Sequence, residues 1–584
     1  MGPKNVKFPQ GHFTIIFPRY TARAKTEDSV DLVQQGSVEH EMKDAVEDGP
    51  VSAPRRKEVL RIVLSMLTRM ATICLVTVGT PSGIKAQGIL NPLVPVGRFR
   101  LGMHALLQVA DSRFGERLEG GVLIREEEPL GLDFSDAAIG SRIFPTLEAL
   151  EESLQIATAG PVDAVVLGMG QMVITQNSLW VPIRADVGIL DWLTIGALVP
   201  FSRRSTELAM SFREDGATVG LTPTGQAGNF LSDLLTAESD LTARVQSWCS
   251  AGPSSTECIT TSNLLTESQE FHRAIRKAYS SHGVFPLDGS VIGTALQSRL
   301  SMLLAAYQAA GVASFPADMP FATTALSQND YKSLVTPPSY GVGGFPIESW
   351  WSPWRLGDVE LYANARLFGS GLGRRGSKTV PKISYLLGAG ALARLGTGRT
   401  DHPDNFFDTG SGDGQTDVEV SIFGSVAASR WSIHSDARYG IQNSTLVVRR
   451  VAGPDRAFPG ESNRQTVSWT PGKYWKVRVA PLLHISNELA VAFDIQRYSK
   501  ASDMYEPSPA NNSTNVDLSI LELETKQATL ETGGGIVFST LRAGRGHPLE
   551  IRVTYRRVVS GSGGRTPKMS HIEFGLRLLG SLWN

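Results

Sequence analysis

Charged side chains alternate with apolar ones through the second half of the chain. This alternation could place many carboxylates and basic groups on one common surface. In the segment DVEVSIFGSVAASRW, Val418, Val420 and Ile422 share one parity, whereas Asp417 and Glu419 share the other. Successive side chains of a β-strand point to opposite faces, so each parity forms one face. A face of carboxylates and basic groups can filter solutes by charge or form ion pairs.

Charged residues of the polar parity recur in many such segments. If the strands close into a barrel, these side chains line its lumen. The candidate lumen residues are Asp358, Glu360, Arg366, Asp417, Glu419, Asp436, Arg438, Lys476, Arg478, Asp494, Glu550, Arg552, Arg556, Glu573 and Arg577. They fit either a charged constriction that selects solutes or an ion-pair network that fills and rigidifies the lumen. We favour the network, which could also act as a filter.

Other motifs indicate little chemistry. GLGRRG at 371–376 matches a dinucleotide fingerprint, but a strand pattern follows it instead of a helix, which favours a turn. The aspartates and glycines of 401–417 could hold calcium, although their spacing fits no EF-hand and a solvated loop is favoured. The histidines are scattered, no GxSxG is present, and His434 is expected to face the lumen in a packing or ion-pair role. We therefore predict no enzyme, no cofactor and no metal site, while a Ser/His pair of a membrane-embedded hydrolase could still be hidden.

Cysteine spacing predicts one disulfide. Cys249 and Cys258 close a short loop, and the third cysteine, Cys74, lies in a segment that we expect to be removed. A disulfide between Cys249 and Cys258 is expected if the protein is exported, and two free thiols are the alternative.

Composition excludes several classes of protein. Lysine and arginine total 56 and aspartate and glutamate 57, which gives no reason to expect nucleic acid as a partner. Mean hydropathy is −0.07 and no run of eighteen apolar residues occurs, so a transmembrane helix is not expected. Strands of a membrane barrel alternate and average to neutral hydropathy, so a membrane location stays open.

An export signal is predicted inside the chain. Residues 66–86 combine the positive Arg69, an apolar stretch over 71–79 and the small Ala86 before a cleavage point. We interpret 1–65 as a disordered or mis-assigned upstream extension. The alternative for 66–86 is an amphipathic core helix.

Residues 87–584 are predicted to form an antiparallel, up-and-down transmembrane β-barrel of about fourteen strands (twelve to sixteen). Tight turns at 191–192, 430–431 and near 487 alternate with long polar stretches, as in outer-membrane barrels, and tryptophans cluster near strand ends. The expected strands are 98–109, 120–133, 165–176, 178–190, 193–212, 357–369, 382–396, 417–429, 431–443, 474–486, 488–499, 530–541, 549–559 and 569–583.

One connection differs from the others. Residues 213–356 show the apolar spacing of helices, so we expect a large extracellular helical insert, stapled by the cysteine pair. A second helical piece at 145–157 falls on the periplasmic side by strand parity.

The strings GDVELYANARLF, GDGQTDVEVSIFGS, RADVGILDWLTIGALVPF and FGLRLLGSLWN resemble bacterial outer-membrane barrels of phenol-degradation pathways and, more distantly, the long-chain fatty-acid transporters. The resemblance covers most of 160–584 and implies an outer-membrane channel for passive uptake of small hydrophobic or aromatic solutes, with lipid and solute as partners. A surface binding or adhesion protein with the barrel as anchor is the alternative, and a hydrolase is a weaker one.

Overall fold

The structure is a computed structural model. It describes residues 91–119, 122–161, 163–281, 283–336, 341–370, 383–428, 430–509, 516–540 and 548–582. The predicted extension at 1–65, the signal at 66–86, the GLGRRG turn and Trp583 lie outside the described residues. Among the described helices, none is both long and apolar enough to cross a membrane.

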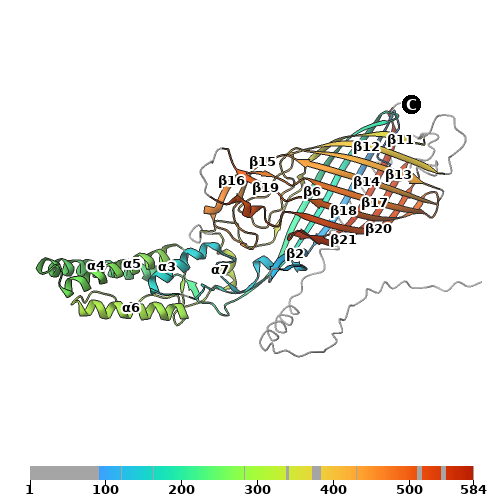
Figure 1. The fold of residues 1–584 in the computed structure, drawn as a ribbon. Coiled ribbons are helices and arrows are strands. Elements are labelled where there is room, and N and C mark those ends of the chain that lie inside the picture. Colours follow the sequence, from blue (N-terminus) through green and yellow to red (C-terminus); the bar gives the residue numbers. More distant parts are fainter. Residues whose placement is uncertain are drawn as a thin grey trace, which may run out of the picture. The chain divides into compact units, whose positions relative to one another are not determined.

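Twelve antiparallel strands of the described chain close into a barrel (Figure 1). In order around the ring these strands are β1 (Arg98–Ala110), β5 (Gly168–Leu190), β6 (Leu193–Arg213), β11 (Val359–Gly369), β12 (Ser384–Leu395), β13 (Asp417–Ala427), β14 (Trp431–Gln442), β17 (Tyr474–His484), β18 (Leu489–Lys500), β20 (Gln527–Ser539), β21 (Leu549–Ser562) and β23 (Ser570–Ser581). The ring closes where β1 pairs with β23, from Arg98 opposite Ser581 to Val109 opposite Ser570. Closure satisfies the backbone of every strand, which a membrane interior requires.

The predicted count of fourteen strands is wrong, for two reasons. The expected strands 165–176 and 178–190 are one strand, β5, because the polar run Gln176, Asn177 and Ser178 pairs with both β1 and β6 instead of turning. The expected strand 120–133 is β3 (Val122–Pro129), which forms a hairpin with β2 (Ser112–Glu119) in a separate sheet. Each correction removes one strand, so together they leave an even number, twelve.

The two ends of the barrel differ in their connections. At one end, called the short-turn end, the connections are 191–192, 370–383, 428–430, 485–488 and 540–548. The opposite, long-loop end has every other connection, among them 111–167, 214–358 and 443–473. The helical piece at 145–157 therefore lies at the long-loop end together with the insert. Its predicted placement on the opposite side was wrong, because it depended on the two miscounted strands.

The barrel has its apolar side chains outside and its charges inside. Leu361, Ile422 and Ile536 of the outward parity are exposed, whereas Glu419 and Asp494 of the inward parity are buried. A soluble sheet would bury the apolar parity. The observed distribution is that of an outer-membrane β-barrel, whose outer face contacts lipid.

The insert contains the predicted helices. The helices of the long-loop end are α3 (Glu148–Thr158), α4 (Thr224–Ala251), α5 (Thr256–Ser281), α6 (Val291–Ala309) and α7 (Gln328–Ser333). The Ser290 side chain caps α6 by accepting from the amide of Gly293 at 3.0 Å. Leu296, Leu300 and Tyr307 then follow at helical spacing and are fully buried.

Short strands complete the long-loop end. They are β4 (Asp136–Ile139), β7 (Val219–Leu221), β8 (Val284–Pro286), β9 (Trp350–Trp351), β10 (Arg355–Leu356), β15 (Thr445–Arg450), β16 (Arg464–Thr470), β19 (Met504–Pro507) and β22 (Thr566–Pro567). The predicted disulfide is present between Cys249, near the end of α4, and Cys258, in the first turn of α5.

A single hydrophobic core joins the insert to other connections. It contains residues of α3, of the outer parts of β5 and β6, of α4 to α7, and of the loops after β12 and β14. Phe458, from the loop after β14, lies 5.4 Å from the ring of Phe134, 5.0 Å from Phe144 and 5.1 Å from Phe406. We call these residues the long-loop core. The insert is thus part of a larger hydrophobic unit.

Candidate functional site in the barrel lumen

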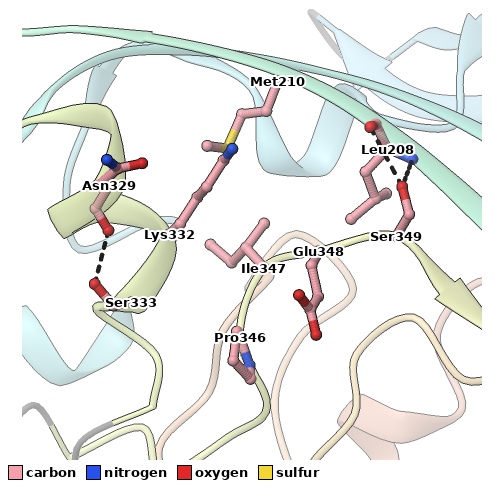
Figure 2. A pocket seen from close by; sticks show the side chains of 9 residues that line it. All are labelled: Leu208, Met210, Asn329, Lys332, Ser333, Pro346, Ile347, Glu348 and Ser349. Atoms are coloured by element: carbon pink, nitrogen blue, oxygen red, sulfur yellow. Dashed lines mark hydrogen bonds between the residues drawn. The ribbon is translucent and has the colours of Figure 1, made fainter.

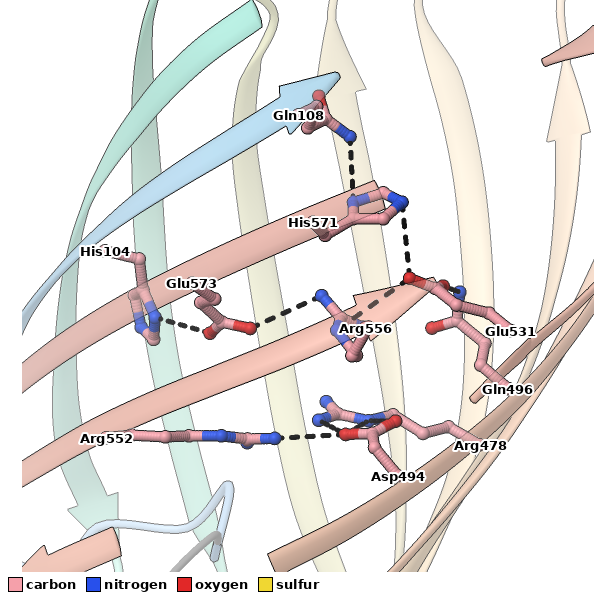
Figure 3. A network of polar contacts seen from close by, with 10 residues as sticks. All are labelled: His104, Gln108, Arg478, Asp494, Gln496, Glu531, Arg552, Arg556, His571 and Glu573. Carbon is pink, nitrogen blue, oxygen red and sulfur yellow. Dashed lines mark hydrogen bonds and ion pairs between the residues drawn. The ribbon is translucent and has the colours of Figure 1, made fainter. Parts of the chain in front are cut away.

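The inward parity of β17, β18 and β21 places Arg478, Asp494 and Arg552 in one cluster (Figure 3). The Nε of Arg478 donates to Asp494 at 3.0 Å, and an NH2 of Arg552 donates to the same carboxylate at 3.0 Å. The side chain of Asp494 is 1% exposed. Two guanidinium groups on one buried carboxylate offset the loss of its hydration.

A second cluster lies beside the first, on β1, β20, β21 and β23 (Figure 3). Glu573 lies 3.1 Å from Nδ1 of His104, and Arg556 donates to it at 3.3 Å. Glu531 lies 3.3 Å from Nε2 of His571 and 3.9 Å from Arg556. Because Arg556 faces both glutamates, it links the two halves of this cluster.

Other predicted lumen residues pair elsewhere on the wall. Arg438 donates to Asp436 at 2.9 Å and to Glu419 at 3.3 Å. Arg577 donates to Glu550 at 3.2 Å. The ion pairs of the described residues form several clusters around the wall and not one continuous chain.

Three predicted residues behave differently. Asp358, just before β11, accepts from the backbone amides of Gly398 at 2.8 Å and Asp413 at 3.3 Å, so it organises a loop and not the lumen. Arg366 and Lys476 have the inward parity of their strands. Within the described part of the chain, the side chains of these two residues form no ion pair or hydrogen bond.

Sequence reasoning missed one cluster on β1, β5 and β11. Asp186 is fully buried and lies 2.7 Å from Nε of Arg100 and 3.1 Å from Nε of Arg184, and the hydroxyl of Tyr362 donates to it at 2.7 Å. The alternation in RADVGIL could have revealed Arg184 and Asp186. Arg394, which donates to Glu360 and Asp417, was also missed.

Exposure varies along the lumen. The inward side chain of Arg438, near the long-loop end of β14, is 41% exposed although wall strands surround it. Arg552, nearer the short-turn end, is only 5% exposed. The lumen therefore admits water at the level of Arg438 and is packed at the level of Arg552.

A chain segment narrows the lumen at the short-turn end. The backbone carbonyls of Asn91 and Pro92 accept from the inward-facing Arg100 at 2.5 and 3.0 Å, and the amide of Val94 donates to the buried hydroxyl of Thr194 at 2.8 Å. Gly188 is required here, because a Cβ at this position would lie 2.1 Å from the carbonyl oxygen of Pro95.

Two Ser/His arrangements in the described part of the chain were candidates for hydrolysis, and neither supports it. In the insert, His272 Nδ1 lies 3.1 Å from Glu238, but the nearby Ser268 bonds to Tyr307 at 2.5 Å, and both Ser268 and His272 are buried. In the lumen, Ser432 lies 3.1 Å from Nε2 of His484 and is 2% exposed. A serine nucleophile must reach a substrate carbonyl, and neither hydroxyl is accessible. His434 faces the lumen as predicted and is buried.

The aspartate-rich loop 401–417 is organised by protein donors. Asp401 pairs with Arg449 at 2.6 Å, and Asp404 pairs with Arg450 at 2.8 Å. Across the described ranges, no three His, Cys, Asp or Glu residues are placed to hold a metal ion. Burial, followed by a hydrogen bond and charge repulsion from Asp358, raises the pKa of Asp413 to about 7.

A cavity of about 340 Å³ lies at the long-loop end, between β6, α7 and the segment before β9 (Figure 2). Leu208, Met210 and Ile347 supply apolar surface, and Lys332 and Glu348 supply charges. The hydroxyl of Ser349 accepts from the amide of Leu208 at 2.9 Å, which fixes one side of the cavity. This recess is separate from the lumen clusters.

No protein-family model and no curated protein matches this chain. Among solved structures, it is similar to an outer-membrane channel of Pseudomonas putida F1 (TM-score 0.35, 8% identity, 86% of this chain and 99% of that chain). It is also similar to the autotransporter translocator domain NalP of Neisseria meningitidis (TM-score 0.25, 7% identity, 90% and 97%) and to the toluene transporter TbuX of Ralstonia pickettii (0.24, 10%, 86% and 95%). Because these TM-scores and identities are low, the assignment of a barrel depends on the strand pairing of this chain and not on the likeness.

Proposed function

We propose that this protein is an outer-membrane channel for the passive uptake of small solutes, hydrophobic or aromatic ones among them. The observation that carries the proposal is the exposure of Arg438 inside a closed ring of strands. Water-accessible space at this level supports a passage more than a solid core. The long-loop end would face the exterior, as long connections do in such barrels.

The cluster of Arg478, Asp494 and Arg552 would be the constriction of this passage. Its side chains come from three strands, and Asp494 and Arg552 are 1% and 5% exposed. Charged rings at a constriction select solutes by size and charge. Solutes would pass one at a time between the cluster and the opposite wall.

The test is conductance of the refolded protein in planar lipid bilayers. Wild type should form discrete channels. Arg552→Ala should raise the single-channel conductance, because it shortens a constricting side chain while Arg478 still pairs with Asp494. Arg557→Ala, the matched control, removes an exposed arginine on the same strand and should leave the conductance unchanged. A folded wild-type barrel without conductance would contradict the channel.

The alternative is a barrel that only anchors a surface-binding domain. The long-loop core and its cavity favour a rigid exposed domain. This function predicts a sealed lumen that does not conduct, together with ligand binding by the long-loop end. The same conductance experiment therefore separates the two functions.

A further inference from the structure

The inward acids of the barrel are already engaged. Asp436 and Glu419 pair with Arg438, Asp494 pairs with Arg478 and Arg552, and Glu573 pairs with Arg556. Asp186, Glu360, Asp417, Glu531 and Glu550 also have basic partners. None of these inward acids is therefore left to pair with a further basic side chain. Such a side chain can form an ion pair only with an anion from outside the protein.

Lys476 is such a side chain. It lies directly opposite Arg438 on β14, and Arg478 is the next inward residue on its own strand. Like charges directly opposite each other in a sheet are destabilising. The closest inward acid on β14, Asp436, is taken by Arg438 at 2.9 Å. The ammonium of Lys476 thus has two arginines as neighbours, at the water-accessible level of the lumen.

Two tyrosines lie beside this lysine. Tyr498 is its cross-strand partner on β18, and Tyr474 is the preceding inward residue on β17. Their ring centroids are 5.8 Å apart at a tilt of 40°. The hydroxyl of Tyr474 donates to Glu419 at 2.7 Å, which fixes its ring. Two aromatic rings therefore adjoin a cation that has no ion-pair partner among the described residues.

We propose that Lys476 binds the carboxylate of a small aromatic acid in the lumen, with the ring of the solute against Tyr474 and Tyr498. The inference rests on the proposed channel function and names its solute class. An ammonium forms a short, charge-assisted hydrogen bond with a carboxylate. Offset or tilted packing of rings adds attraction beyond apolar contact. A neutral aromatic would lose the first interaction, and acetate would lose the second.

The first test measures block of the channel current by benzoate, acetate and benzyl alcohol. Benzoate should block wild type at lower concentration than either analogue. Lys476→Gln should weaken benzoate block by about tenfold, the loss of about 1.4 kcal/mol expected for a charged hydrogen bond. Lys476→Arg should restore most of it. Lys473→Gln, which removes an exposed lysine just before β17, should behave as wild type.

Equal block of wild type and Lys476→Gln would overturn the site. Equal block by acetate and benzoate would overturn the aromatic class. Calorimetric titration of benzoate into the detergent-solubilised protein provides a readout without conductance. Lysine-dependent binding in a protein that does not conduct would refute the channel but keep the site. A conducting protein that binds no benzoate would keep the channel and refute the site.

Discussion

Asp413 is a carboxyl group whose surroundings oppose its ionisation. It lies in the loop before β13, where burial and the neighbouring Asp358 raise its pKa from 3.8 to about 7. Between these two values the folded protein holds a proton that the unfolded chain has lost. Stability contributed by this group is therefore complete below pH 4 and declines as the pH rises to about 7.

Asp413→Asn should remove that decline, because the amide is neutral at every pH. We expect the variant to exceed wild type in unfolding free energy at pH 8 by on the order of 1–2 kcal/mol, allowing for partial solvent screening, and to match it at pH 4. Denaturant titrations at both pH values measure the difference. Asp455→Asn, at an exposed position after β15, is the control. An identical gain at pH 4 and pH 8 would refute the assignment.

For single residues of the lumen, the sequence predicts which face of the strand each side chain lies on, but not which partner it contacts. Period two places Asp494 and Arg552 on the inward face, and the structure agrees. Which charges meet depends on the stagger between neighbouring strands, and one sequence does not contain that information. The meeting of Asp494 with Arg552, whose strands are separated by β20 in the ring, was therefore not predictable.

β13 illustrates the two faces of a strand at equal depth. Ile422, in its middle, is exposed on the outer face, and Ser421 faces the lumen directly opposite Arg438. Ile422→Arg should reduce the unfolding free energy by about 2–4 kcal/mol, because lipid cannot hydrate the charge. Ser421→Arg adds repulsion from Arg438 and should cost about 1 kcal/mol at most.

Folding equilibria in lipid vesicles, measured in urea, distinguish these two costs. Equal losses at the two positions would argue that the outer face is not in contact with lipid.

Among the elements, the strands of the second half could be predicted and those of the first half only in part. From β11 onward each expected strand corresponds to one observed strand, because alternation is clear there in spite of register shifts in β11 and β20. β5 spans 23 residues, far more than the 9–11 that a bilayer needs, so its polar middle resembled a turn. The outer part of β5 contributes Met172 and Ile174 to the long-loop core. Its length follows from this second role.

At the scale of the whole molecule, the barrel and the long-loop core are stabilised by different interactions. Phe458 is fully buried in the long-loop core, whereas Phe368 on β11 is 66% exposed on the outer face. Phe458→Ala should destabilise the long-loop end by about 3–5 kcal/mol, because it leaves a cavity among packed rings. Phe368→Ala should not affect it.

Limited proteolysis of the insert, followed beside the heat-modifiable gel mobility of the barrel, measures both parts of each variant. We expect faster cleavage of the Phe458 variant with unchanged barrel mobility. Loss of the barrel mobility shift in that variant would show that the two parts fold together.

The long-loop core could not be predicted beyond its helices. The apolar spacing of Leu300 and Tyr307 identified a buried helix face. The contact of Phe144 with Phe458 joins segments more than three hundred residues apart, and no local sequence pattern predicts such a contact.

The pairing of β1 with β23 also fixes an order of events. Every other junction of the ring joins strands that are consecutive in chain order around it, so these can form progressively as the chain is delivered. The junction of β1 and β23 must wait for the last strand, and until then β1 and β21 each have an unpaired edge. Contacts so distant in sequence form slowly. The last strand of the ring thus determines when the barrel closes. A change in β23 should therefore slow assembly more than an equivalent change in another strand.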